Sequence, residues 1–520
     1  MSGEVPSKRK ARMNHRSTAA ARLPRGFGWL TAALGAAAAV LSATGSWVPS
    51  LWGDEAASLL SAQRPLPSLF VMLGHVDAVH GAYYLLLHGW IRLAGTTPFA
   101  LRLPSAIAVG LAVAAVTLIA ARLRSPRLAV AAGIICCIVP RVTYMGEEAR
   151  SYAVSAAVAA WLTYLLVEIV RRRYPPAWLW VAYGAFLAAG VYLFLFLGLL
   201  VVAHGIVLAA SRVGRATLIR WTVACAAALL AASPLVFWAI DERRQIAYLA
   251  SRTEVSFGTL SVSLWFGSVE FAVIAWLLII VALAVPLVAH IRRRDRASRP
   301  PPHLPSVELV AATWLLVPSI ILVTSQFFVA DFTARYLSYC APAAALLIAC
   351  GVDRLASRRG WAITAAVAAV VGLAVPAYLA QRGPYSKNDS DWSAISATLG
   401  ARAQAGDAVA FDESVRPSRR PRLALRTYPA GFAGLEDVML ETPYYRNTSW
   451  PDRVHSLATT ASLGRLAAVD RLWLVEYATP THIDSYGIDT LAGLGFARTA
   501  EYRTHRSVII LFTRQPTSGR

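Results

Sequence analysis

Long apolar runs alternate with short charged segments over most of the chain. Several of these runs reach about 20 residues, the length at which an α-helix crosses the hydrocarbon core of a membrane. We expect about eleven membrane-spanning helices, from Phe27–Trp47 to Trp361–Leu379. A cleaved signal peptide is the alternative for the first run, but the length of the run favours a span. The pattern predicts a polytopic α-helical membrane domain over residues 27–380, after a disordered basic arm over residues 1–26.

One apolar run is too short to fit this series. Ala82–Gly95 has about 14 residues and contains His88 and Arg92. That length suits a helix lying on the membrane surface better than a span. If the run does not cross, the arginine clusters that lack acids fall on one side of the membrane and the acidic pairs on the other. The positive-inside rule then predicts a multi-pass protein of the cell membrane with a cytoplasmic N-terminus.

The pattern changes after Gln381, where apolar stretches become short. Alternating strand-like and helix-like stretches predict a small extracytoplasmic α/β domain over residues 381–520. The predicted strands are Ala408–Phe411, Leu472–Val475 and Ser507–Thr513, and the predicted helices are Asp391–Ala405 and stretches near Arg453–Leu463 and Ile483–Leu494.

The composition is typical of a membrane protein and argues against a nucleic-acid partner. Hydrophobic residues make up 57% of the 520 residues, and the mean hydropathy is +0.51. The net charge of +21 does not indicate nucleic-acid binding, because the arginines form short clusters between apolar runs. All five cysteines lie in apolar runs without CxxC spacing, so we expect them to be core residues and not a disulfide framework.

Unusual charge gathers in three segments on the predicted outer side, and each segment abuts a helix end. Ionisable groups at this depth indicate a functional site. A carboxylate can accept a proton from a hydroxyl, and arginine forks hold phosphate oxygens. The simpler alternatives are a solvated helix start for the first segment and a self-satisfied ion pair for the second. The segments are Asp54 with Glu55, then Glu147-Glu148-Ala149-Arg150, then Asp331 with Arg335-Tyr336.

Histidines and aromatic residues surround the first acidic pair. His75, His80 and His88 have no HxxxH spacing with an acid partner, so hydrogen bonding is a simpler role for them than metal ligation. The sequence does not decide whether the site binds a divalent metal ion. Tyr83 and Tyr84 fit an aromatic belt at the membrane interface, although such rings also form platforms for sugars.

Taken together, these motifs resemble the GT-C glycosyltransferases. The nearest branch contains the protein O-mannosyltransferases and the aminoarabinose transferase of lipid A. The matching stretches are Trp52-Gly53-Asp54-Glu55-Ala56, Asp77–His80, Tyr83–Trp90, Leu101–Ser105, Glu147–Tyr152, Phe332–Leu337 and Lys387–Trp392.

The resemblance implies a GT-C fold with short juxtamembrane helices in the first outer loop. It implies a polyprenyl-phosphate sugar donor, with mannose as the leading sugar, and a glycan, lipid or protein acceptor from the cell envelope. It makes Asp54 the catalytic base, with Glu55 and Glu148 in support, and Arg150 and Arg335 the ligands of the donor phosphate. The implied substrate-binding residues are Asp77, His80, Tyr83, Tyr84, Tyr152 and Tyr336.

Two positions depart from the family pattern. His80-Gly81-Ala82 stands where relatives often have His-Pro-Pro, and Glu147 stands where glutamine is usual and adds a negative charge near the site. Two other classes of function compete with a transferase. A transporter or flippase for a lipid-linked sugar would show inverted repeats and mid-membrane charges, and neither is evident. A scaffold would not need the acidic motifs.

Overall fold

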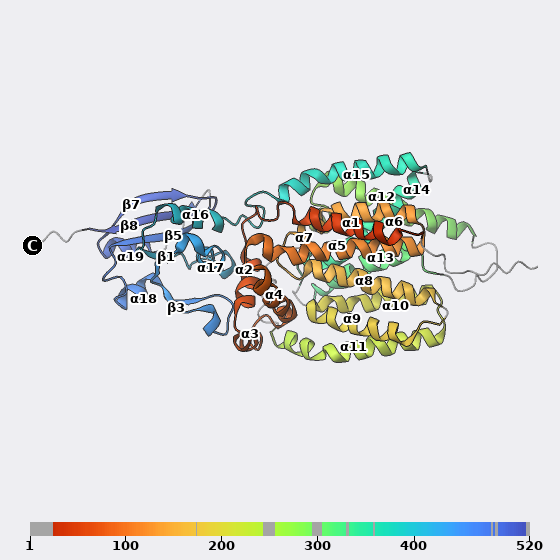
Figure 1. The fold of residues 1–520 in the computed structure, drawn as a ribbon, viewed down its shortest axis with the longest axis horizontal. Helices are drawn as coiled ribbons and strands as arrows, with labels where there is room; N and C mark the ends of the chain where they lie inside the picture. The colour runs from red at the N-terminus through yellow and green to blue at the C-terminus, as the bar shows by residue number, and fades with distance from the viewer. Residues whose placement is uncertain are drawn as a thin grey trace, which may run out of the picture.

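The computed structural model describes residues 24–172, 174–242, 255–293, 304–328, 332–356, 359–479, 482–483 and 487–515. A helical part and a C-terminal sheet part lie at opposite ends of an elongated molecule (Figure 1). The prediction of a helical membrane domain followed by a small α/β domain is confirmed. Residues 1–23 of the predicted basic arm and Asp331 lie outside the described residues.

Helices occupy all the apolar runs that the sequence predicts as spans. Among the described residues, seven helices are long and apolar enough to cross a membrane, or eight if the bent pair α6–α7 is one span, and three shorter apolar helices accompany them. The total of eleven spans stays a prediction. The helices are α1 (Phe27–Ala43), α5 (Pro98–Leu123), α6 (Pro126–Ile138), α7 (Pro140–Gly146), α8 (Tyr152–Arg171), α9 (Ala177–Leu193), α10 (Leu200–Ala210), α11 (Arg215–Asp241), α12 (Val269–Arg293), α13 (Val307–Ser325), α14 (Ala341–Leu355) and α15 (Gly360–Gln381).

A sharp bend separates α6 from α7. The two helices meet at 60° on either side of Val139, and α7 begins at Pro140. Proline lacks a backbone N–H and clashes with the preceding turn, so it ends one helix and suits the first position of the next. The bend turns the chain toward the interface with the sheet part, where the loop 147–151 carries the second acidic motif.

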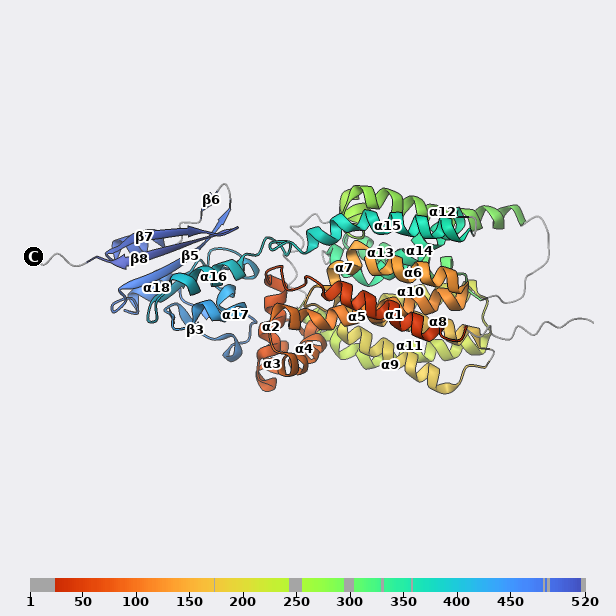
Figure 2. The same ribbon diagram turned by 45° about the horizontal axis from the view of Figure 1, so that its top comes forward.

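Four short helices form a layer between the helical part and the sheet (Figures 1 and 2). The prediction of a short helix at Ala82–Gly95 is confirmed, whereas α3 was not predicted. The layer consists of α2 (Gly53–Gln63), α3 (Leu66–Leu73), the 3-10 turn η1 (Ala78–His80) and α4 (Gly81–Ala94). On α4, Tyr83, Tyr84 and Leu87 are buried, while Leu85 and Leu86 face outward.

The C-terminal part is built on a mixed sheet with strand order β2-β1-β5-β8-β7, and β6 pairs with β5. Strand β1 is parallel to both of its neighbours, and β8 is antiparallel to β5 and β7. The strands are β1 (Ala408–Phe411), β2 (Glu436–Asp437), β5 (Arg471–Thr479), β6 (His482–Ile483), β7 (Phe496–Arg503) and β8 (Ser507–Arg514), with a separate pair β3 (Leu440–Thr442) and β4 (Arg453–Val454). The helices are α16 (Trp392–Arg402), α17 (Leu423–Thr427), α18 (Leu457–Ser462) and α19 (Ile488–Gly493).

Helix α2 is shared between two hydrophobic cores. Its residues Ala56 and Leu60 pack into the core beneath the sheet, which contains Trp392 of α16. On another face, Leu59 packs with Tyr83 of α4. Apolar residues on two sides of one helix fix it between two layers. The N-terminus of α2, which carries the first acidic pair, is thereby fixed relative to both parts.

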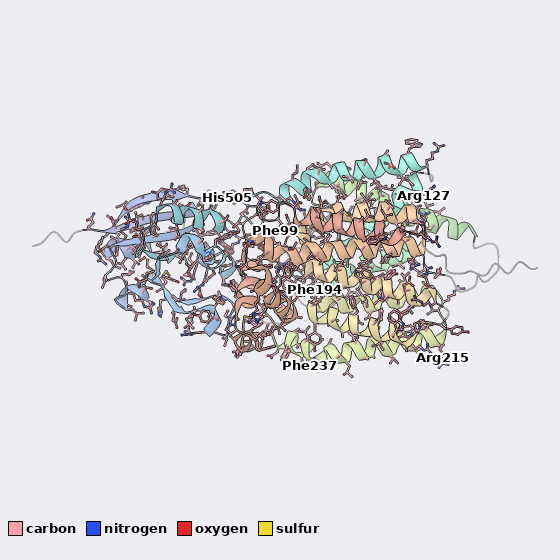
Figure 3. All side chains as sticks on the ribbon, viewed as in Figure 1. Phe99, Arg127, Phe194, Arg215, Phe237 and His505 are labelled. Atoms are coloured by element: carbon pink, nitrogen blue, oxygen red, sulfur yellow. The ribbon has the colours of Figure 1, made fainter. Side chains whose placement is uncertain are left out.

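The opposite end of the helical part holds a separate ion-pair network. Glu308 at the start of α13 accepts from Arg124 and from Arg354, each at 2.5 Å, and Arg124 also pairs with Asp353 at 3.0 Å. Arg127 lies at this same end of the bundle, far from the sheet (Figure 3). Charge is thus concentrated at the two ends of the helices, as expected where helices cross a membrane.

Candidate active site

A large cavity lies where the helical part meets the α2–α4 layer and the sheet part. Its volume is about 1650 Å³, and residues from all three regions line it. Asp54 at the start of α2, Glu148 and Arg150 after α7, and Arg335 at the start of η5 (Ala334–Cys340) all reach it. The three outer segments predicted to form one site are therefore brought together, apart from Asp331, which is not described.

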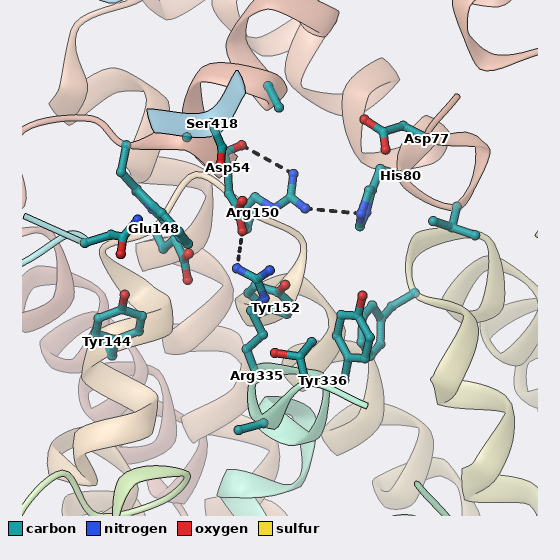
Figure 4. A pocket seen from close by; sticks show the side chains of 18 of the residues that line it. Asp54, Asp77, His80, Tyr144, Glu148, Arg150, Tyr152, Arg335, Tyr336 and Ser418 are labelled. Atoms are coloured by element: carbon teal, nitrogen blue, oxygen red, sulfur yellow. Dashed lines mark hydrogen bonds and ion pairs between the residues drawn. The ribbon is translucent and has the colours of Figure 1, made fainter. Parts of the chain in front are cut away.

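Asp54 and two arginines form the centre of the cavity (Figure 4). The Oδ2 atom of Asp54 pairs with Nη1 of Arg335. Arg150 donates from Nη1 to the backbone carbonyl of Asp54 and to Ser58 Oγ, both at 3.3 Å, and its Nη2 lies 3.1 Å from His80 Nε2. No described residue donates a hydrogen bond to Oδ1 of Asp54. One oxygen of this carboxylate is therefore held, and the other is available to a ligand.

Glu55, the neighbour of Asp54, faces away from the cavity. Its carboxylate accepts from Nε and Nη2 of Arg102 at 2.7 and 2.5 Å, and from the backbone N–H of Ala149 at 2.9 Å. Both side chains are fully buried. Adjacent residues at the start of a helix point in directions about 100° apart, so the two acids take different environments. The structure does not bring Glu55 into the site.

Glu148 lines the cavity from its inner side. Its side chain is nearly buried, and Oε1 has no hydrogen-bond partner among the described residues. Burial raises the pKa of Glu148, and the nearby positive charge of Lys387 opposes that shift. The hydroxyl of Tyr152, also on the cavity wall, likewise has no hydrogen-bond partner in the part of the chain that the structure describes. Both polar groups are positioned to bind something that occupies the cavity.

Glu147 lies outside the cavity and is neutralised. Lys387 and Arg382, which precede the sheet part, approach its two carboxylate oxygens at 3.3 and 3.4 Å. The ammonium of Lys387 also lies 3.4 Å from the ring centroid of Tyr144. The extra negative charge that the sequence places near the site is therefore compensated by two cations.

The turn η1 closes one side of the cavity. Asp77 adopts a left-handed conformation with φ of 61°, and its Oδ2 accepts from the hydroxyl of Tyr84 at 3.1 Å. Burial, with the charge of Arg150, lowers the pKa of His80, so its ring is neutral and can accept from Arg150. Glu242, after α11, accepts from the N–H of Ala78 at 3.0 Å, and burial raises its pKa to about 7.

An apolar wall faces the membrane-spanning helices. The rings of Phe196 and Tyr336 lie 5.1 Å apart, and Phe194 joins them with its centroid 5.9 Å from Tyr336. Val236 and Ile240 of α11 continue this wall. The cavity therefore combines a charged centre with an apolar side, as a ligand with a polar head and a hydrocarbon tail requires.

Most of the residues predicted from sequence reach the cavity, but three do not. Glu55, Tyr83 and Tyr84 are buried behind its wall. The residues that line it are Asp54, Asp77, His80, Glu148, Arg150, Tyr152, Arg335 and Tyr336. Sequence reasoning missed several further lining residues, among them Arg141, Glu242, Arg416, Arg419 and Trp450.

The sequence carries a signal for one of the lining residues that were not predicted. Glu242 belongs to an acidic pair that follows a predicted span on the outer side, the same signal that singled out Asp54. Arg141 follows a proline inside an apolar run, and the other three lie in the tail. Nothing in their spacing distinguishes them from solvated residues. For the metal left open by the sequence, no group of three or more His, Cys, Asp or Glu side chains in the described part of the chain is arranged to hold an ion.

The arrangement of the helices and the sheet part matches known structures. ArnT from Cupriavidus metallidurans in the apo state has a TM-score of 0.55 at 13% identity, with 94% of this chain and 98% of that chain covered. The same protein bound to undecaprenyl phosphate has a TM-score of 0.52 at 14% identity, with 93% and 98% covered. At such identities the likeness establishes the fold, so the chain has the GT-C fold.

A narrower match comes from part of the sequence. Residues 82–238 match the model of a family described as dolichyl-phosphate-mannose-protein mannosyltransferase. A comparison with curated protein sequences finds no significant match. The resemblance to the GT-C glycosyltransferases that the motifs indicate is thus confirmed at the level of the fold.

Proposed function

We propose that the protein is an integral-membrane glycosyltransferase that takes a sugar from a polyprenyl-phosphate donor. The observation that carries the proposal is the Asp54–Arg335–Arg150 cluster, which sets a carboxylate beside two guanidinium groups at an apolar wall. The match of residues 82–238 to a mannosyltransferase family and the ArnT complex with undecaprenyl phosphate support this reading. Mannose is the leading sugar, and a cell-envelope glycan, lipid or protein is the acceptor.

In the proposed reaction, Asp54 acts as general base. The acceptor hydroxyl gives its proton to Asp54, and its oxygen forms a bond to the anomeric carbon. The bond between that carbon and the phosphate oxygen breaks, and its electron pair leaves with polyprenyl phosphate. The leaving phosphate gains one negative charge, which Arg335 and Arg150 stabilise. Asp54 suits the role of base better than Glu148, because the side chain of Asp54 is partly exposed whereas Glu148 is buried.

The remaining lining groups position the two substrates. The aromatic wall of Phe194, Phe196 and Tyr336 receives the start of the prenyl chain. The unpaired Oε1 of Glu148 and hydroxyl of Tyr152 hold sugar hydroxyls. Arg127 lies at the far end of the helices (Figure 3), and the positive-inside rule then assigns the cavity to the extracytoplasmic side. A site at one end of the helices favours a transferase over a transporter, whose site lies mid-membrane.

A donor screen tests the proposal. The purified full chain in nanodiscs is supplied with undecaprenyl-phosphate sugars, mannose first, and with a heat-treated cell-envelope extract that retains glycans, lipids and proteins as the source of acceptors. We expect release of undecaprenyl phosphate from one donor. The Asp54→Asn variant should release undecaprenyl phosphate about 10²–10⁴-fold more slowly. The exposed Asp470→Asn change provides the matched control and should leave the rate unchanged.

Two results would contradict this function. Full activity of Asp54→Asn would remove that residue from the role of base. Movement of the lipid-linked sugar across a vesicle membrane without transfer would favour the transporter.

A further inference from the structure

The sheet part supplies one end of the cavity. A short turn, η6 (Pro417–Arg419), packs directly on the start of α2. A Cβ atom on Gly53 would collide with the backbone carbonyl of Ser418, so the glycine permits this close approach. Asp54 is the next residue along α2, and Ser418 lies beside it in Figure 4. Asp54 and the turn η6 therefore line the same part of the cavity.

Two of the four arginines between residues 416 and 422 have no acidic partner among the described residues. Arg420 pairs with Glu413 at 2.5 Å, and Arg422 pairs with acids of the same domain. Arg416 makes no side-chain hydrogen bond or ion pair with any described residue, and Arg419 makes only a 3.4 Å contact to a tyrosine hydroxyl. The two unpaired arginines are the two that line the cavity, whereas Arg420 and Arg422 do not.

This end of the cavity differs in charge from its centre. At the centre, Arg150 and Arg335 stand among the acids Asp54, Asp77 and Glu148. The residues that the sheet part contributes to the cavity include two arginines and no acid. Two guanidinium groups without a carboxylate attract an anionic group, and arginine binds phosphate or carboxylate through paired N–H donors.

The sheet part also contributes an aromatic side chain. Trp450 lines the cavity and is partly buried, packed against the core that contains α2. Indole rings form flat platforms for sugar rings. An aromatic face together with a serine and two arginines is a combination that fits a charged saccharide.

The donor phosphate does not account for these arginines. A prenyl chain must remain in hydrocarbon, which keeps its phosphate near the helical part, where Arg150 and Arg335 lie. Arg416 and Arg419 belong instead to the sheet part, at the turn η6 that packs on the start of α2. We propose that the acceptor is an anionic saccharide, whose phosphate or carboxylate is bound by Arg416 and Arg419 and whose sugar ring stacks on Trp450. This inference rests on the proposed function and names the class of its acceptor.

Binding of small saccharides tests the inference without turnover. The full chain in nanodiscs containing undecaprenyl phosphate, which fills the donor-phosphate position, is titrated with glucose 6-phosphate, glucuronate and methyl glucoside. Saturation-transfer NMR reports each dissociation constant. We expect the better of the two anionic probes to bind about tenfold more tightly than methyl glucoside. The phosphate and carboxylate arms identify which anion is preferred.

Variants then assign the binding site. Arg416→Gln/Arg419→Gln should bring the anionic probes to the affinity of methyl glucoside. Arg446→Gln, an exposed arginine of the same domain outside the cavity, should retain the preference. Equal affinities for the three probes in the unmodified protein, or no detectable binding, would overturn the inference. So would a preference that survives the double change. The donor screen is read separately, so failure of one proposal is not mistaken for failure of the other.

Discussion

The ammonium of Lys387 lies 3.3 Å from the carboxylate of Glu147 and 3.4 Å from the ring centroid of Tyr144. Neither charged side chain is exposed. Lys387 belongs to the segment that enters the sheet part, and Glu147 belongs to the loop that carries Glu148 and Arg150 into the cavity. This buried contact joins the two parts of the molecule one residue away from the site.

Breaking this contact should destabilise the protein. The Lys387→Met change leaves Glu147 buried with only Arg382, and loss of one partner of a buried ion pair costs about 3–5 kcal/mol. The double variant Glu147→Gln/Lys387→Met removes both charges. We expect its loss in the free energy of unfolding to be smaller than the sum of the losses in the two single variants by at least about 1 kcal/mol. Denaturant unfolding in detergent of the two single variants and the double variant measures this coupling. Additive effects would show that the pair is not coupled.

The neighbours Asp54 and Glu55 should separate activity from stability. Glu55→Gln leaves the fully buried Arg102 without its carboxylate, and we expect a loss of about 3–5 kcal/mol in the free energy of unfolding. Asp54→Asn should cost only about 1 kcal/mol, because that pair is partly exposed, while removing most turnover. Thermal unfolding and donor turnover are measured on both variants. Similar losses of stability in the two variants would contradict this division.

Gly53→Ala should disturb the contact between α2 and η6. The added methyl group collides with the Ser418 carbonyl, and relief of the clash must move η6 or the start of α2. We expect a destabilisation of about 1–3 kcal/mol and a reduced rate of donor turnover. Gly89→Ala is the control, because a Cβ at this exposed position of α4 meets nothing within 4 Å. It should be neutral or slightly stabilising.

Glu242 should make stability depend on pH. Its pKa in the folded protein, about 7, exceeds the ordinary value of 4.5 because of burial. Its contribution to stability is therefore fully present below about pH 4.5 and is lost as the pH rises through about 7. Glu242→Gln mimics the neutral form, so it should match the unmodified protein in Tm at pH 4 and exceed it at pH 8. Thermal scans across this range test the sign, and a Tm difference that does not vary with pH would refute it.

The sequence predicts most of the elements because their signals are local. Runs of about 20 apolar residues determine the spans, and the continuous apolar stretches of β1 and β8 determine strands buried on both faces. Strand β7 (Phe496–Arg503) was missed because it lies at the edge of the sheet and alternates small, polar and charged residues. The predicted helices near Arg453 and Ile483 begin later than expected, after the short strands β4 and β6.

The site is only partly predictable from the sequence, because the orientation of its side chains depends on contacts between distant segments. Charged residues at helix ends beside apolar runs are expensive to place near hydrocarbon, so Asp54, Glu148 and Arg335 are visible in the sequence. Which way a side chain points depends on packing that the sequence does not reveal. Glu55 was therefore expected to support Asp54 in the site, although it pairs with Arg102, 47 positions away in the sequence. Arg416 and Arg419 resemble any solvated arginines until the tail is folded against α2.

Helix α2 has an important consequence for how this protein could have diversified. Because its two sides belong to different cores, the sheet part cannot be exchanged like an interchangeable module without rebuilding the support of Asp54. A chain cut after α15 would lose the core of the sheet part on which one side of α2 packs, so the membrane helices alone would not hold Asp54 in place. Under the proposed function, changes of acceptor are therefore expected to arise in the loops of the sheet part, with its inner face held constant.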